Sequence, residues 1–138
     1  MKKSNKNIFV LHQQLSNDSI FIKNLEVCKV LLINNSNFPW LILVPMRENI
    51  IEIYDLTYAD YQQTMLEVRN ITKIFAEITG ADKMNVATFG NVITQLHIHI
   101  IARFKNDKAF PNPVWNSKLP TTPYSVNKSQ ELIDKFRQ

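Results

Sequence analysis

The stretch QLHIHII at residues 95–101 alternates nitrogen-rich and apolar side chains along one predicted strand. Successive side chains of a strand point to opposite faces of a sheet, so the three nitrogen-rich residues share one face. These residues are Gln95, His97 and His99. The apolar residues between them must be buried on the other face. The sequence therefore predicts a row of polar groups, with alternate residues about 6.5–7 Å apart.

A pair of histidines on one strand face is compatible with several kinds of chemistry. A neutral imidazole is a nucleophile and a base near pH 7, provided that its second nitrogen is held as a donor, for example to a backbone carbonyl. A neighbouring histidine can donate to phosphate oxygens or protonate a leaving group. Phosphoryl or nucleotidyl transfer, metal ligation and two solvent-facing histidines without a function all fit the pair taken alone.

Metal ligation is the least favoured of the functional alternatives. Zinc is typically held by three or four protein ligands, with carboxylates or cysteines among them. Residues 95–101 contain no Asp, Glu or Cys. We therefore expect neither a metal nor a cofactor at this strand.

The bulk composition indicates one globular domain over residues 1–138. Apolar residues make up 45% of the chain and charged residues 20%, which is typical of folded domains. The net charge of +4 suits an anionic ligand only weakly. No run of five basic residues and no nucleic-acid-binding motif occurs, so we expect no nucleic-acid partner. Lys2, Lys3 and Lys6 indicate a loose basic N-terminus.

The cysteine content and the hydropathy pattern favour a cytoplasmic protein. Cys28 is the single cysteine, which excludes a disulfide within the chain and fits a reducing compartment. We interpret it as a small core residue. No window approaches the roughly 18 apolar residues of a membrane span. The short apolar stretch near the N-terminus is interrupted at His12, so no signal peptide is expected.

Three helices are predicted from periodicity and capping. The clearest covers residues 57–79, with Thr57 as its N-cap and Gly80 after its end. Its apolar stripe, which we expect to be core, consists of Tyr58, Tyr61, Met65, Val68, Phe75 and Ile78. A short first helix is predicted over residues 8–15, with His12 as a packing or capping residue. A last short helix begins near Ser125 or Asn127.

The strand pattern predicts an α+β fold. Strands are expected at residues 20–22, 29–33, 40–44, 84–89 and 96–104, with a further short edge strand near residues 50–53. This order favours an antiparallel sheet of about five strands with the long helix packed on one face. We place the core at about residues 9–115 and an irregular tail, ending in the short helix, at residues 116–138.

The motif and its surroundings resemble the histidine-triad (HIT) family. Its signature is His-φ-His-φ-His-φ-φ, where φ is apolar, and here Gln95 replaces the first His. Residues 31–34 and 39–45 look like the hairpin of that family. Gly90-Asn91 before the motif, Arg103 after it and the stretch PNPVW at residues 111–115 resemble a bacterial branch. The resemblance covers residues 9–115.

The resemblance implies a nucleotide or nucleotide-like phosphate ligand, no metal, and a homodimer in which two sheets join. The central His of the family motif is the nucleophile, and it corresponds to His97, which would form a nucleotidyl intermediate that water cleaves. The last His corresponds to His99 and would contact phosphate. Gln95, at the first catalytic position, would hydrogen-bond without titrating.

The resemblance also implies nucleotide-binding residues and leaves two functions open. Asn34 stands where the family contacts ribose, although it also fits a turn, and Asn91 can donate to a phosphate or leaving group. Arg103 can reach a phosphate or simply lie exposed at the end of a strand. Trp40 stands where many members carry a further His that orients the nucleophile. The first hypothesis is a nucleotide phosphoramidase or nucleotidyl hydrolase. The second, favoured by Gln95 and Trp40, is a non-catalytic nucleotide-binding regulatory protein.

Overall fold

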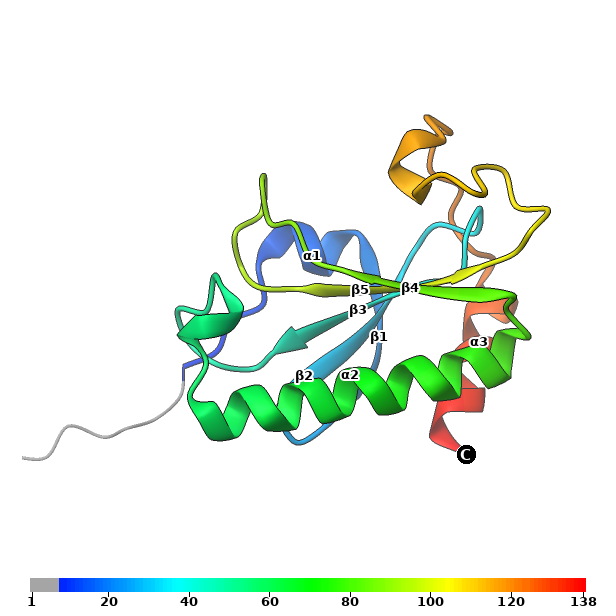
Figure 1. Ribbon diagram of the computed structural model, residues 1–138. Helices are drawn as coiled ribbons and strands as arrows, with labels where there is room; N and C mark the ends of the chain where they lie inside the picture. Colours follow the sequence, from blue (N-terminus) through cyan, green and yellow to red (C-terminus); the bar gives the residue numbers. More distant parts are fainter. Residues whose placement is uncertain (1–7) are drawn as a thin grey trace, which may run out of the picture.

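A five-stranded antiparallel sheet forms the centre of the computed structural model, which describes residues 8–138 (Figure 1). In spatial order its strands are β1 (Ser19–Asn24), β2 (Cys28–Ile33), β3 (Trp40–Pro45), β5 (Ile98–Arg103) and β4 (Lys83–Ala87). The predicted antiparallel α+β fold is confirmed. The basic residues Lys2, Lys3 and Lys6 lie outside the described residues.

The long helix α2 (Tyr58–Thr79) begins and ends at the predicted caps. The Thr57 hydroxyl accepts a hydrogen bond from the Asp60 backbone N–H at 3.1 Å, which satisfies a donor of the first turn. Gly80 ends the helix with φ of 69°, a left-handed conformation that glycine adopts without a Cβ clash. Local chemistry alone therefore sets both ends of this helix.

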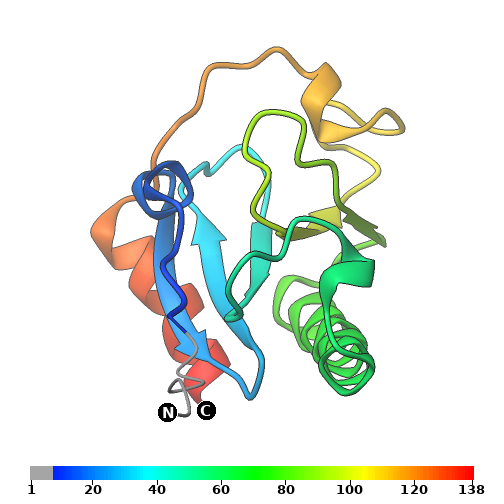
Figure 2. The same ribbon diagram turned by 90° about the vertical axis from the view of Figure 1, so that its left-hand side faces the viewer.

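Helix α2 covers one face of the sheet, as the view along its axis shows (Figure 2). Val68, Ile71 and Phe75 are buried in the main core with the apolar residues of the central strands. The prediction that Tyr58 and Tyr61 are core residues is wrong, since both are exposed. Buried residues of α2 begin only at residue 64, because the first turns of the helix do not pack on the sheet.

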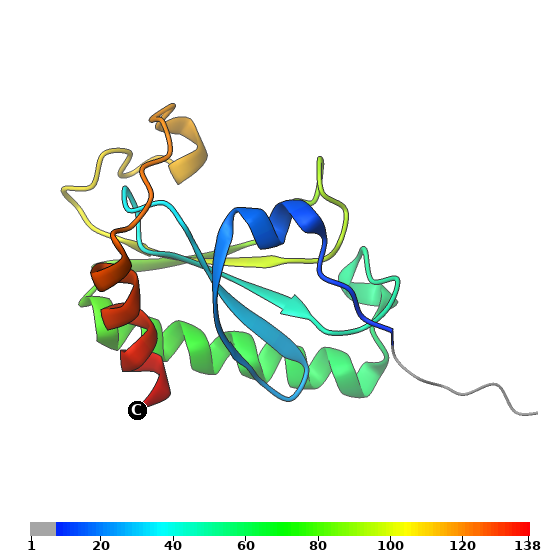
Figure 3. The ribbon, with the colours of Figure 1, turned by 180° about the vertical axis from the view of Figure 1, so that it is seen from behind.

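The C-terminal helix α3 (Val126–Arg137) packs into the same core (Figure 3). Its Ser125 cap agrees with the predicted start, because the hydroxyl accepts from the Lys128 backbone N–H at 3.2 Å. Phe136 is buried, and its ring lies 5.7 Å from that of Phe75 on α2. The core thus extends beyond residues 9–115, because the predicted tail contributes a helix to it.

The opposite face of the sheet is covered by the N-terminal segment and α1 (Gln13–Asn17). Leu15 packs there on Leu31 and Ile42. The helix predicted over residues 8–15 is misplaced, because the chain before α1 runs across the sheet without helical hydrogen bonding. His12 is the N-cap: its Nδ1 accepts from the Gln14 backbone N–H at 3.0 Å, as one of the two predicted roles requires.

The edge strand predicted near residues 50–53 is absent from the described sheet. A 3-10 turn, η1 (Ile53–Asp55), lies there instead. The Asp55 carboxylate accepts from the backbone N–H groups of Ile51 and Glu52 at 3.1 and 2.9 Å. A side chain that binds nearby backbone donors competes with sheet pairing, which periodicity cannot reveal.

Removing the Phe136 ring should destabilise the whole fold, because α3 belongs to the main core. Phe136→Ala should lower the free energy of unfolding by about 3 kcal/mol or more, measured by urea denaturation. Val126→Ala, on an exposed side chain of the same helix, should stay within about 0.5 kcal/mol of the parent. Equal, small effects of both substitutions would show that α3 is an accessory element.

Candidate functional site

Strand β5 carries His99, and His97 directly precedes the strand; the two lie together on the face of the sheet opposite α2. Their ring centroids are 5.0 Å apart, and each residue is 8% exposed. His99 pairs with Ile42 on β3 and Ala87 on β4, so it lies between two strands. The predicted alternation is confirmed, since Ile98 and Ile100 point into the main core.

The His97 ring is held by the backbone just before it. Its Nδ1 lies 2.7 Å from the Gln95 carbonyl oxygen. A carbonyl oxygen can only accept, so we infer that Nδ1 carries the proton. In the neutral ring, Nε2 then keeps its lone pair. This is the arrangement that a nucleophilic or basic imidazole requires.

The His99 ring is held by Trp40, and its Nδ1 accepts a hydrogen bond where that of His97 donates one. The indole Nε1–H donates to His99 Nδ1 at 3.0 Å. Burial lowers the pKa of His99 to about 4, and electrostatic repulsion from His97 adds to this effect. At neutral pH the ring is therefore uncharged, with its proton on Nε2. The pair presents one lone pair and one N–H group.

Further aromatic side chains pack around the His99 ring. Trp115, on the 3-10 turn η2 (Val114–Asn116), has its ring 5.0 Å from that of His99 and 5.2 Å from that of Trp40. Phe89, in the segment after β4, lies 4.7 Å from the Trp115 ring. This shell removes water from His99, and desolvation disfavours the imidazolium form.

Two hollows meet at the histidine pair, and both rings line each of them. The first measures about 450 Å³ and extends past Asp18 and Asn34 to Thr121 in the C-terminal segment. The second measures about 490 Å³ and is lined by Asn91, Trp115 and other residues of the segments after β4 and before η2. Among the described residues, no Lys or Arg lines either hollow. A ligand can therefore extend to both sides of the pair.

Comparison with known proteins identifies the fold family. The HIT domain profile matches residues 14–106, which is most of the chain and includes the histidine pair. The chain belongs to the HIT domain family. No curated protein matches it.

Solved structures of histidine triad proteins are similar to this chain over nearly their whole length. The protein from Bradyrhizobium japonicum is 40% identical with a TM-score of 0.91, and the match covers 94% of this chain and 96% of that one. The protein from Marinobacter aquaeolei VT8 is 39% identical with a TM-score of 0.90, covering 94% and 93%. That from Sinorhizobium meliloti 1021 is 34% identical with a TM-score of 0.91, covering 94% and 96%.

The side chain of Gln95 does not join the histidine pair of this HIT domain. Its Oε1 accepts from the His12 backbone N–H at 2.8 Å, and its Nε2 donates to the Val10 carbonyl at 2.9 Å. The prediction of a shared face fails at this residue, because β5 begins at Ile98 and strand alternation does not extend back to Gln95. Gln95 instead binds the N-terminal segment, and only its backbone carbonyl reaches His97.

Asn34 and Asn91 lie on opposite sides of the pair, one in each hollow. The Asn34 Oδ1 accepts from the Tyr124 backbone N–H at 2.9 Å. It therefore holds the C-terminal segment whose Thr121 and Pro123 form part of the first hollow's wall. This wall was not predicted, because no local pattern links the tail to residues about 90 positions earlier.

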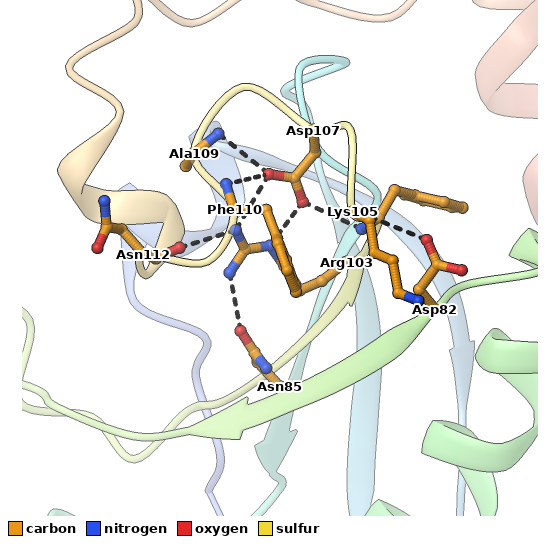
Figure 4. Close-up of polar contacts among 9 residues, drawn as sticks. Asp82, Asn85, Arg103, Lys105, Asp107, Ala109, Phe110 and Asn112 are labelled. Carbon is orange, nitrogen blue, oxygen red and sulfur yellow. Dashed lines mark hydrogen bonds and ion pairs between the residues drawn. The ribbon is translucent and has the colours of Figure 1, made fainter.

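Arg103 is not brought to the pair, so the predicted phosphate contact is not supported. Its guanidinium is buried and bound to Asp107 at 2.8 Å, to Asn85 at 2.9 Å and to the Asn112 carbonyl at 2.8 Å (Figure 4). These bonds hold the segment between β5 and η2. The network therefore positions the turn that carries Trp115.

Asp107 is the partner that makes this network stable. Burial raises the pKa of Asp107, but the Arg103 bond and three backbone N–H groups outweigh that effect and hold the pKa well below its usual range. The three donors are Phe104, Ala109 and Phe110. No helix joins Arg103 to Asp107, so their spacing of four residues is not a sequence signal for this pair.

Residues 8–138 contain neither a candidate metal cluster nor a candidate membrane-spanning helix. No group of three or more His, Cys, Asp or Glu side chains that could hold a metal ion is found among them. No helix in this part of the chain is long and apolar enough to cross a membrane.

Acidification should destabilise the fold through His99. The unfolded chain protonates this residue near pH 6.5 and the folded chain only near pH 4. Between these values the unfolded state binds more protons. The free energy of unfolding should therefore decrease as the pH is lowered, by roughly 3 kcal/mol at most. Denaturation curves from pH 7.5 to 4.5 check this. His99→Gln should flatten the dependence, and an unchanged slope would contradict it.

Breaking the Arg103–Asp107 pair should cost far more than breaking an exposed one. Asp107→Asn should lower the free energy of unfolding by about 3 kcal/mol or more, because it leaves a buried guanidinium without its counter-charge. Glu131→Gln, which breaks an exposed pair with Lys128, should change it by less than about 0.5 kcal/mol. Urea denaturation measures both, and similar values would refute the structural role of Arg103.

Proposed function

We propose that this HIT protein is a hydrolase that transfers a nucleotidyl group to His97 and then to water. The observation that carries the proposal is the His97 ring, whose Nδ1 is bound to a carbonyl while Nε2 is left for attack beside two hollows. The family implies a nucleotide or nucleotide-like ligand. Phosphorus placed between the hollows would meet this nitrogen.

In the first step, His97 Nε2 attacks the α-phosphorus of the substrate. A bond forms between Nε2 and phosphorus, and the bond from phosphorus to the leaving group breaks. The leaving group departs with the bonding electron pair and takes up a proton from solvent. The positive charge that develops on the imidazole is stabilised through the Nδ1–H bond to the Gln95 carbonyl.

In the second step, water attacks phosphorus from the side that the leaving group has vacated. The bond between phosphorus and Nε2 breaks, and its electron pair returns to His97. The product is a nucleoside monophosphate, and the proton of the attacking water passes to solvent. Splitting the reaction in this way replaces one difficult displacement with two easier ones.

The lining of the hollows favours a substrate with a single phosphoryl group. The first hollow has the Asp18 carboxylate and the Asn34 amide for ribose hydroxyls. The second has aromatic walls and Asn91 for the leaving group. Since no Lys or Arg of the described residues lines either one, a long polyphosphate would lack counter-charges there. A nucleoside phosphoramidate, with one phosphorus–nitrogen bond, fits better than a dinucleoside polyphosphate.

His97→Ala should abolish turnover of adenosine 5′-phosphoramidate, by on the order of 10³-fold or more in kcat/KM. In the parent protein, a rapid quench followed by mass spectrometry should find adenylate attached at His97. The control is His12→Asn, which replaces the histidine outside the pair by another residue that can cap α1. This variant should retain activity. Diadenosine tetraphosphate should be a poorer substrate.

Two outcomes would overturn the enzyme proposal. Turnover that survives in His97→Ala would assign the chemistry to another group. Tight binding of adenosine monophosphate, without turnover or adduct in the parent protein, would favour the non-catalytic nucleotide-binding protein instead.

We further propose that the protein forms a homodimer through the edge strand β4. We also propose that it is located in the cytoplasm. Within residues 8–138, β4 is bordered by β5 alone, and Val86 on it is half-exposed. The family resemblance implies joined sheets, and the single buried Cys28 suits a reducing compartment. Light scattering should give twice the chain mass for the parent and a lower mass for Val86→Lys. A monomeric parent would refute the dimer.

A further inference from the structure

Trp40 and His99 are diagonal neighbours on adjacent strands. Trp40 is the first residue of β3 and pairs with Ile101, while His99 lies two residues before Ile101 on β5. Side chains in this relation share a face and are within reach of each other when one is aromatic. The register of the sheet therefore places the indole beside the imidazole.

The bond between them determines where the His99 proton resides. An indole N–H can only donate, so the His99 Nδ1 that receives it at 3.0 Å must carry a lone pair. An imidazolium ring has a proton on both nitrogens, so its Nδ1–H would face the indole N–H of Trp40, and two donors would meet without an acceptor. The bond thus excludes the charged form of His99.

The surroundings of His99 offer no compensation for a charge. The ring faces His97 just before β5, Trp40 on β3, Phe89 after β4 and Trp115 on η2. Asp18 is the one carboxylate among the described residues that line the hollows. A charged His99 would also repel the positive charge that develops on His97 when its Nε2 attacks, since the two ring centroids are 5.0 Å apart.

We propose that Trp40 is a positioning residue that holds His99 neutral, with Nε2–H directed at a phosphoryl oxygen while His97 attacks. This role rests on the proposed function for its phosphoryl partner. The hydrogen bond itself is independent of turnover. Trp40 stands where the family resemblance implies a further histidine that orients the nucleophile, but its bond is to His99, the second imidazole of the pair.

Trp40→Phe tests the proposal, because it keeps an aromatic ring and removes the N–H donor. Long-range ¹H–¹⁵N spectra of the parent should show His99 with a bare, hydrogen-bonded Nδ1 and a protonated Nε2. In Trp40→Phe the pKa of His99 should rise by about one unit or more, so that its protonated fraction at pH 5 grows from about a tenth to about half. The acid limb of kcat for adenosine 5′-phosphoramidate should move upward by the same amount.

Trp115→Phe is the matched control, because that indole contacts His99 through its ring. It should leave the pattern of His99 nitrogen resonances unchanged. A protonated Nδ1 in the parent protein would overturn the proposal, even if the variant failed to fold. An unshifted His99 titration in a folded Trp40→Phe variant would overturn it too. If the titration shifts but the parent protein does not turn over phosphoramidate, the proposed function fails and the proton assignment stands.

Discussion

The hydrogen bond from His97 Nδ1 to the Gln95 carbonyl is the interaction on which the site depends. It assigns the proton to one nitrogen and leaves the other with a lone pair beside two hollows. Its geometry requires the backbone at Gln95 to stay in place ahead of the first residue of β5. The Gln95 side chain secures that backbone through its two bonds to Val10 and His12. The amide therefore serves the nucleophile indirectly.

The rest of the fold supplies rigid walls around the pair. The Arg103–Asp107 network fixes the segment that ends in Trp115, and the Asn34 bond to Tyr124 fixes the C-terminal segment beside the first hollow. In both cases polar side chains bind irregular backbone, since neither segment has the regular hydrogen bonds of a strand. The sheet positions the histidines, and these bound segments shape the space that a ligand would occupy.

Features encoded by neighbouring residues could be predicted from the sequence. The ends of α2 follow from Thr57 and Gly80, and the common face of His97 and His99 follows from strand alternation. The direction of Gln95 could not be predicted, because it depends on where β5 begins. The Trp40–His99 bond joins residues 59 positions apart. Such a contact depends on the register between strands, which no local pattern contains.

The stereochemical course at phosphorus tests the central claim most directly. Two successive in-line displacements, the first by His97 and the second by water, each invert the configuration at phosphorus. Together the two steps give overall retention. An adenosine phosphoramidate with a chiral α-phosphorothioate, hydrolysed in ¹⁸O-labelled water, makes the outcome visible by ³¹P NMR. The account predicts retention. Inversion would mean that water attacks the substrate directly, and it would contradict nucleophilic catalysis by His97.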